Sequence, residues 1–457
     1  MTNLELFIPA YANDNDAYVP EIWANEALIQ LEANMVAAQL VHRDFSSALA
    51  RFGDTVNTRR PRQFKAKFKT QGDSIDKQDA VADNVAVVLN RHIHVSYPIF
   101  DEEASLSFAD LLNEYIEPAG RAMAQMLDEI VLGTMYEFVG SSAGKLGAGL
   151  TRATLVSVKQ VLDDAKVPND GMRNIILGSS AYNGLLNVDE LVRVNESGTS
   201  DALRNGQLGS LFGMGVFMDQ NCPNISSLAG ATTAGAINEA AGYSIGETTV
   251  TVDGFTGALT VGSWMTVAGD MTPLKITATT ETLGDTTSIT FEPALKSAVS
   301  DDAVITVYNP AAVNEAAGYA VGYSKAITID GASVAPQSGQ MISLAGIEYS
   351  AVDDGGLSTT SVTLNKALEA AAADDAVVGF GPAGAYGFAF HKNAVTLVTR
   401  PLATPRGNVN SAVASYNGLS MRVTWSYDHD VQADIVTFDL LAGIKVLDDR
   451  LGCIIYS

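Results

Sequence analysis

Residues 202–219 read ALRNGQLGSLFGMGVFMD, and this Gly-rich stretch decides the fold that the sequence predicts. Its glycines permit turns that other residues adopt only with strain. The run from Gly215 to Asp219 that follows has the length and composition of a short strand. We therefore expect a loop, a Gly-rich turn and then a strand. The phosphate-loop pattern GxxxxGK[ST] is absent, so these glycines do not predict a phosphate site.

A tandem repeat follows this stretch and divides the chain. The hexamer NEAAGY occurs at residues 238–243 and again at 314–319. The similarity continues in VDG and IDG, MTVAG and ISLAG, TSIT and TSVT, and DDAV in both copies. Two copies of about 75 residues, spanning about 236–310 and 314–382, therefore lie in tandem. Asp-Gly turns and β-branched runs predict that both copies are all-β.

Length and composition limit the class of protein. A chain of 457 residues suggests about three domains, and 47% hydrophobic residues supply sizeable cores. The net charge of -24 argues against wrapping nucleic acid with the whole surface. Two cysteines are no disulfide framework, which favours a reducing, cytoplasmic origin. Met1–Asp16 does not resemble a signal peptide, and no apolar run reaches the length of a membrane span.

Charge is unevenly distributed along the chain. Residues 236–382 hold four lysines, no arginine and seventeen acidic residues. Residues 54–69 are instead basic, with six cations: Arg59, Arg60, Arg62, Lys65, Lys67 and Lys69. Phe64 and Phe68 alternate with these lysines, as in proteins that stack on nucleic acid. Because the chain as a whole is acidic, we favour contact with an acidic surface on a neighbouring copy.

Periodicity predicts the remaining elements. Residues 1–18 form an extended arm, and a helix runs from Pro20 to about Phe45. Strands at 63–69 and 85–95 form a long ribbon with little core of its own. The longest helix begins at a capping Ser105 or Ser107 and runs to about Phe138. Strands after Gly384 (421–425, 435–446 and 453–456) should pair with the region before residue 225.

Two groups of residues were weighed as metal sites. His92 and His94 lie on one face of a predicted strand, but no third ligand stands at a suitable spacing. The pairs Asp301-Asp302 and Asp374-Asp375 occupy the same point of each repeat without the alternating oxygen ligands of a calcium loop. An interface face and solvated turns are the favoured interpretations. We expect no catalytic residue, no cofactor and no metal.

The order of these elements resembles the major capsid proteins of tailed bacteriophages, which have the Hong Kong 97 phage fold. The stretch 202–219 is similar to the segment that leads into a strand of the family's axial domain. The inserted β region, especially 249–269, resembles the coat-protein branch of short-tailed lambdoid phages, as does His391–Pro405. Gly418–Val423 is similar to the family's closing strands. Two repeat copies stand where one barrel is expected, so one larger β body and two barrels both remain open.

The resemblance implies an α+β capsid fold with an all-β insertion of two tandem repeats. It divides the chain into an N-terminal arm and helix (1–46), an extended loop (47–101) and a spine helix in the peripheral domain (102–140). An axial domain (141–235) and the β insertion (236–383) follow. Return strands (384–457) complete the axial and peripheral domains. The six basic residues from Arg59 to Lys69 would then lie in the extended loop and contact another subunit.

The function implied is that of a major capsid protein in a virion, not an enzyme. Copies would assemble in the host cytoplasm into hexamers and pentamers of an icosahedral shell around double-stranded DNA. A scaffolding protein, a portal and a decoration protein would be partners, without a membrane. One alternative is the shell protein of an encapsulin-like nanocompartment. Another is a surface or receptor-binding protein that uses its β repeats.

Overall fold

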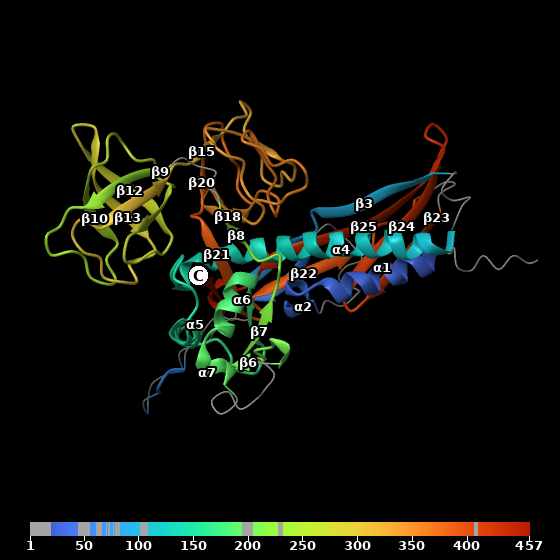
Figure 1. The fold of residues 1–457 in the computed structure, drawn as a ribbon, viewed down its shortest axis with the longest axis horizontal. Coiled ribbons are helices and arrows are strands. Elements are labelled where there is room, and N and C mark those ends of the chain that lie inside the picture. Colours follow the sequence, from blue (N-terminus) through green and yellow to red (C-terminus); the bar gives the residue numbers. More distant parts are fainter. Residues whose placement is uncertain are drawn as a thin grey trace, which may run out of the picture. The chain divides into compact units, whose positions relative to one another are not determined.

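The computed structural model describes residues 20–43, 55–60, 66–69, 71, 74–75, 77, 83–100, 108–193, 204–226, 232–405 and 410–457. The fold is α+β, with more strands than helices (Figure 1). The described residues form two compact units. Unit 1 takes its residues from Met1–Asn34, His92–Met123 and Thr399–Leu441, and unit 2 takes the rest. No helix of the described residues is long and apolar enough to cross a membrane.

Unit 1 is a helix packed on an antiparallel sheet. Helix α1 (Pro20–Asn34) packs on β23 (Asn410–Tyr416) and β24 (Leu419–Asp428). Strand β25 (Ala433–Val446) pairs with β24, and β3 (Arg91–Phe100) also pairs with β25. Tyr97 stacks between Tyr115 and Phe438, with ring centroids 5.1 and 6.2 Å away. This aromatic stack joins β3, the long helix and β25 in one core.

Helix α4 (Phe108–Thr134) is the long helix that the sequence predicts, and its residues belong to both units. It ends four residues earlier than expected, because Met135–Gly140 continues as a 3-10 helix. The predicted caps Ser105 and Ser107 lie outside the described residues. Buried positions recur at helical spacing along the helix, with Ala124, Leu127 and Val131 fully buried.

The ribbon is formed by other residues than the sequence indicates. Strand β1 (Thr55–Arg60) pairs with β2 (Asp83–Val88), so the expected strand at 63–69 is wrong for residues 66–69, which are exposed and carry no strand. The second expected strand, 85–95, divides at residues 89–90 into β2 and β3. Periodicity alone missed this, because the alternation of apolar and basic residues that suggests a strand also occurs in an exposed segment without a core.

A mixed sheet is the centre of unit 2. Its strand order is β4-β26-β21-β5-β7-β6, and β8 pairs with β21. The bounds are β4 Ser142–Gly144, β5 Arg173–Leu177, β6 Ser210–Leu211, β7 Met214–Met218, β8 Asn224–Ile225, β21 Gly384–His391 and β26 Gly452–Tyr456. Phe388 lies opposite Ile176, and Ile454 lies beside Ser142. The predicted pairing with segments before residue 225 is therefore confirmed for 453–456, and also for 435–446, which pairs with β3, but it is wrong for 421–425, which pairs only with β23 and β25.

Short helices cover this sheet. They are α5 (Arg152–Asp164), α6 (Ser179–Leu186) and α7 (Asp189–Val192), and Leu155, Val158 and Leu162 of α5 enter the core. The Thr151 hydroxyl caps α5 by accepting from the Thr154 amide. Helix α2 (Ala37–Leu40), strand β22 (Val395–Arg400) and a 3-10 helix at Asp449–Leu451 complete the elements outside the repeats.

The first repeat copy is a closed six-stranded barrel with its own hydrophobic core. The strands follow the cyclic order β10-β13-β12-β11-β14-β9. Their bounds are β9 Thr232–Ile237, β10 Thr249–Asp253, β11 Trp264–Val267, β12 Leu274–Thr282, β13 Asp285–Glu292 and β14 Val304–Tyr308. We call this copy the first β body.

The second copy, here the second β body, has a separate core and the strand order β18-β17-β20-β15-β16-β19. Its strands are β15 Ala311–Val313, β16 Ile327–Asp330, β17 Met341–Leu344, β18 Ile347–Ser350, β19 Ser361–Val362 and β20 Val377–Phe380. When the strands of each copy are numbered from one to six along the chain, the second copy has the same neighbours as the barrel except for one pair. Its fourth and fifth strands, β18 and β19, are short and do not pair with each other. The described residues thus form two β bodies rather than one larger body (Figure 1).

The repeated hexamer builds the same turn in both bodies. Gly242 and Gly318 have φ of +63° and +61°, and a Cβ would lie 2.3 Å from the Val299 oxygen or 2.6 Å from the Ala372 oxygen. The tyrosine that follows each glycine accepts an amide proton through its hydroxyl, at 2.8 Å from Thr251 N and Thr328 N. Glycine and tyrosine are therefore both required for the turn.

The two bodies attach in series and use the same edge to do so. Lys275 of the first body and Ser350 of the second hold equivalent positions, because Lys275 pairs with Trp264 and Ser350 pairs with Met341. The Lys275 ammonium contacts Ser343 and Glu348 of the second body, with 2.8 Å to the Glu348 carboxylate. Ser350 lies against Gly133 of α4, where an added Cβ would be only 1.8 Å from the Ser350 hydroxyl oxygen. The first body thus docks on the second as the second docks on α4.

Candidate assembly interface

The six basic residues predicted as an interface lie on and beyond the ribbon. Arg59 and Arg60 are in β1, opposite Asn84 and Asp83 of β2. Arg62 and Lys65 lie outside the described residues. Lys67 and Lys69 are exposed, and Phe68 between them is fully exposed. The structure therefore shows two of the six side chains, and both are on the surface.

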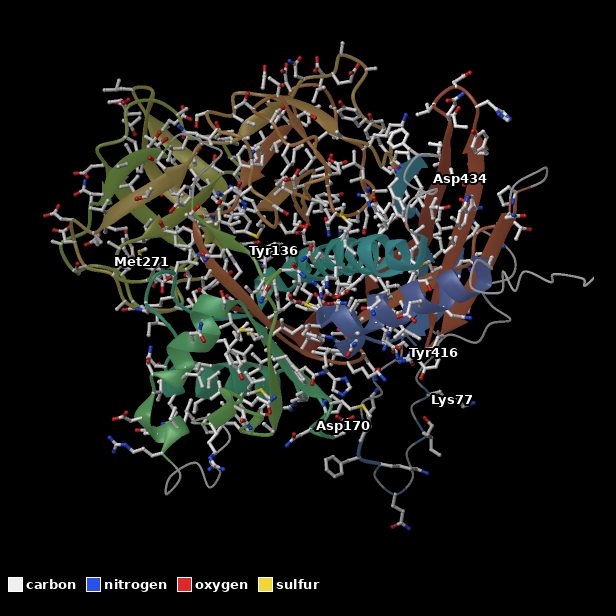
Figure 2. All side chains as sticks on the ribbon, turned by 45° about the vertical axis from the view of Figure 1, so that its right-hand side comes forward. Lys77, Tyr136, Asp170, Met271, Tyr416 and Asp434 are labelled. Carbon is white, nitrogen blue, oxygen red and sulfur yellow. The ribbon has the colours of Figure 1, made fainter. Side chains whose placement is uncertain are left out.

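The exposed segment between β1 and β2 combines cationic and apolar side chains. Besides Phe68, Ile75 is 71% exposed, and Lys77, labelled in Figure 2, is also exposed. Burying a Phe side chain is worth about 1.5–3 kcal/mol, so leaving it in water forgoes that stabilisation. Phe is enriched at protein interfaces, whereas Lys belongs to their polar rim, so Phe68 is the side chain of this segment that suits the centre of a contact.

Acidic side chains are exposed on several other parts of the chain. The turn between β24 and β25 carries exposed Asp430 next to half-buried Asp428, and Tyr427 and Val431 are 43% and 52% exposed. In the first β body the exposed acids include Glu239, Asp253 and Asp285. A surface of this kind complements a basic segment in charge, and such pairing speeds and orients association.

A buried polar network joins the second β body to α4. Asn365 donates to the Thr134 hydroxyl at 3.1 Å and accepts from the Ser350 amide at 3.1 Å. The Lys366 ammonium contacts Glu137 and lies 3.2 Å from Glu369, while the Tyr136 hydroxyl donates to the Gly339 carbonyl at 2.9 Å. Buried polar groups with matched partners fix one arrangement, so this joint holds the second β body rigidly.

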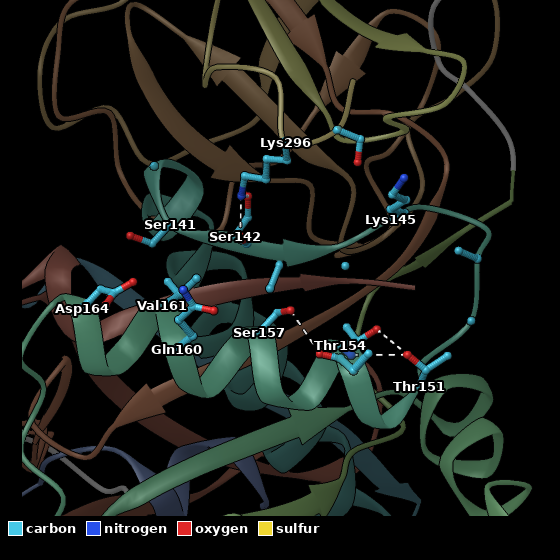
Figure 3. Close-up of a pocket in the computed structure, with 17 residues that line it drawn as sticks. Ser141, Ser142, Lys145, Thr151, Thr154, Ser157, Gln160, Val161, Asp164 and Lys296 are labelled. Atoms are coloured by element: carbon cyan, nitrogen blue, oxygen red, sulfur yellow. Dashed lines mark hydrogen bonds between the residues drawn. The ribbon is translucent and has the colours of Figure 1, made fainter. Parts of the chain in front are cut away.

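A pocket of about 610 Å³ lies between the first β body, β4 and α5 (Figure 3). Lys296 reaches across from the first body to the hydroxyl and carbonyl oxygens of Ser142, and burial lowers the pKa of its ammonium. Lys145 donates to the Gly269 carbonyl at 2.6 Å. Both lysines therefore tie the first body to the rest of unit 2.

Residues 140–144, GSSAG, also fit the GxSxG pattern of hydrolases, a match that was wrongly taken to be absent when no catalytic residue was expected. That pattern needs its serine exposed on a strand-to-helix turn beside a histidine. Ser142 instead lies within strand β4, is buried, and has Lys296 as its neighbour. The geometry is that of a structural joint between strand β4 and the first β body.

The candidate metal residues have structural partners. His92 Nε2 lies 2.9 Å from Asp439, a buried carboxylate that also pairs with Arg422 at 2.6 Å. Asp301 and Asp374 each accept an amide proton at 3.0 Å, from Glu239 and Glu315. Asp302 and Asp375 adopt φ of +58° and +59°, which Asp tolerates better than most residues. Within the described ranges, no three His, Cys, Asp or Glu side chains are placed to hold a metal ion.

The Gly-rich stretch 204–218 builds a turn and a central strand. Gly206, Gly209 and Gly213 all have positive φ. Strand β7 then pairs in parallel with β5, with Val216 beside Ile175. The Tyr182 hydroxyl accepts from the Leu208 amide at 3.0 Å and donates to the Gly206 carbonyl. The glycines therefore shape the loop that leads into β7.

No protein-family model matches the chain, and no curated protein sequence matches it. The chain is similar to solved structures from phages, and several of these are capsid structures. A structure of Mycobacterium phage Che8 matches at 12% identity over 92% of this chain and 90% of that chain, with a TM-score of 0.44. The capsid structure of cyanophage P-SCSP1u matches at 11% identity, over 91% and 86% of the two chains, with a TM-score of 0.40. The capsid of Ralstonia phage GP4 matches at 9% identity, over 93% and 90%, with a TM-score of 0.40.

Proposed function

We propose that this chain is a major capsid protein that self-assembles into hexamers and pentamers of an icosahedral shell around double-stranded DNA. The sequence resemblance supports this, through the element order and the stretches 202–219 and 391–405. In this proposal the protein is part of the virion and assembles in the host cytoplasm. A scaffolding protein and a portal act during assembly, and a decoration protein binds the outside. The two β bodies are an insertion within the axial domain.

One observation carries the proposal: the exposed segment between β1 and β2. A monomer that displays fully exposed Phe68 between two lysines gains by burying that side chain in a partner. We infer that the segment from Arg59 to Lys69 contacts an acidic, partly apolar surface of a neighbouring copy. The role is geometric, because each copy covers surface that another copy leaves exposed.

Charge reversal tests this contact. The triple variant Arg59→Glu/Arg60→Glu/Arg62→Glu should prevent closed shells in negative-stain microscopy of the expressed chain, because it places like charges against an acidic neighbour. The matched control Arg59→Lys/Arg60→Lys/Arg62→Lys keeps the charge and should still assemble. Circular dichroism checks that both variants fold. Normal shells from the charge-reversed variant would refute the contact.

The contents of purified shells distinguish the proposed virion shell from a nanocompartment. Shells made during phage growth should contain double-stranded DNA, detected by their 260 nm absorbance and nuclease protection. An enclosed protein without DNA would favour the nanocompartment. Dispersed monomers under all conditions, with or without a scaffolding protein, would argue against a shell function.

A further inference from the structure

The base of the β1–β2 ribbon is tied to the second β body by Arg91. Strand β2 ends at Val88, and β3 begins at Arg91, whose side chain is half-buried. The Arg91 guanidinium donates through Nη1 to the Ser324 carbonyl at 2.9 Å and through Nη2 to the Leu364 carbonyl. Both carbonyls belong to the second β body, one before β16 and one after β19. One side chain therefore joins two segments of that body to the end of the ribbon.

These contacts suit an arginine better than a lysine. A guanidinium is planar and presents its N–H donors in a fixed fork, so it satisfies two carbonyl oxygens at once, whereas an ammonium is a compact point charge. Asp354 of the second β body adds an opposite charge, and its carboxylate is held by the Thr363 hydroxyl at 3.0 Å. Burial lowers the pKa of Arg91 to about 10 and the charge of Asp354 opposes that shift, so the guanidinium stays cationic at neutral pH.

A glycine allows the ribbon base to lie directly against β25. A Cβ at Gly443 would be 2.6 Å from the Val88 oxygen and 3.2 Å from the Leu89 Cα. Leu89 is 7% exposed and Val87 is fully buried, so the base of the ribbon is packed. A two-stranded ribbon is marginally stable by itself. The contacts at its base therefore decide both its stability and its direction.

The Leu364 carbonyl lies directly beside the joint between the second β body and α4. Asn365, the next residue, donates to the Thr134 hydroxyl of α4 at 3.1 Å. The Lys366 ammonium contacts Glu137, in the 3-10 helix that continues α4. Three consecutive residues, 364–366, thus contact the ribbon base and the long helix. Because the two contacts share one short segment, a shift of the second β body on α4 also moves the acceptor of Arg91.

We propose that Arg91 is a positioning residue that couples the direction of the ribbon to the seating of the second β body on α4. While that body is seated, its two carbonyls hold the guanidinium and fix the ribbon base. When the body shifts, Arg91 loses its acceptors and the ribbon pivots. A strand rises about 3.3 Å per residue, so a pivot of about 10° moves the far end of a six-residue strand by roughly 3 Å. Such a displacement misplaces Arg59 and Arg60, so this step rests on the intersubunit contact proposed above.

Hydrogen exchange of the unassembled full chain tests the coupling. Mass spectrometry of a peptide covering residues 83–90 reports the opening of the ribbon, because every residue of β2 pairs with β1. Arg91→Ala removes two hydrogen bonds from a charged donor and should increase this opening roughly tenfold or more. Lys325→Met removes an exposed cation next to Ser324 and is the matched control, with a change of less than about threefold. Arg91→Lys keeps the charge without the fork and should fall between the two.

A double-variant cycle separates coupling from local stability. Lys366→Met, which loosens the joint with α4, should increase the opening of residues 83–90 in the chain that keeps Arg91 and add nothing in Arg91→Ala. Exchange of residues 341–350 reports the loosening itself. An equal effect of Lys366→Met in both backgrounds would overturn the proposal, and so would an unchanged ribbon in Arg91→Ala. If Arg91→Ala does not fold, Lys366→Met alone decides, because a loosened joint with an unchanged ribbon excludes the coupling. The measurement uses single chains, so its failure would leave the proposed shell function untouched.

Discussion

Replacing Lys366 by Met should loosen the joint between the second β body and α4. The Lys366 side chain is only 5% exposed, contacts Glu137, lies 3.2 Å from Glu369 and sits 5.0 Å from the Tyr349 ring centroid. Lys366→Met preserves the length of the side chain and removes its charge. Both glutamates then lose a buried cation.

The structure sets the size of the effect. Removing one member of a buried ion pair costs about 3–5 kcal/mol, because the remaining charge stays buried. Glu137 and Glu369 are 22% and 30% exposed, and Glu369 keeps Lys445 at 2.5 Å, so both can recover solvation. We therefore expect the lower end, about 3 kcal/mol. This corresponds to a roughly hundredfold loss of hydrogen-exchange protection in residues 341–350.

The control is Lys325→Met, an exposed lysine of the same β body, which should change protection less than about threefold. The double variant Lys366→Met/Glu137→Gln should recover part of the loss, because it also removes the stranded charge. Equal exchange in Lys366→Met and Lys325→Met would refute the idea that this ammonium holds the joint. Full loss of protection in the double variant would show that packing, not charge, is responsible.

Two further predictions concern the hexamer and the exposed segment. Gly242→Ala and Gly318→Ala should each destabilise their own β body by about 2 kcal/mol or more, because each added Cβ meets a carbonyl oxygen. The controls Gly246→Ala and Gly322→Ala have positive φ but open space around the Cβ, so each should cost about 1 kcal/mol. Limited proteolysis of the four variants compares them, and equal cleavage would contradict the steric argument. Phe68→Ser should leave the melting temperature of the monomer unchanged and reduce assembly in sedimentation, with Ile29→Ser, another exposed apolar position, as the control. Unchanged assembly would show that Phe68 contacts no partner.

The sequence predicted those elements whose apolar residues recur at the spacing of a helix or a strand. The α4 stripe and the β-rich repeats follow from 3.6-residue and two-residue periodicity. The end of α4 was set too late because Met135, Tyr136 and Phe138 continue the apolar stripe, yet they adopt 3-10 geometry while being buried. Periodicity records burial, which both kinds of helix share.

The buried polar groups were missed for a different reason. Asp128 lies between Ala124 and Val131 on the buried face of α4, so its position in the stripe was a visible signal. Its partners at residues 36–38 are backbone amides, which carry no signature in sequence. The pairing of Lys275 with Glu348 joins residues 73 positions apart, and only the packing of the two bodies brings them together. The pair Asp301-Asp302 was correctly predicted to lie in a turn. Asp301 accepts a backbone amide there, and Asp302 adopts positive φ.

The serial attachment of the two β bodies makes the insertion extensible. The first barrel begins at Thr232 and ends at Tyr308, and these two residues lie opposite each other on paired strands. A chain that leaves and returns at adjacent positions accepts or loses a whole body without rerouting its neighbours. Each body also brings the edge by which it attaches, so a duplicated gene segment arrives with its own docking surface. The size and charge of the insertion can therefore change by a whole domain, while the contacts between α4 and the second β body stay the same.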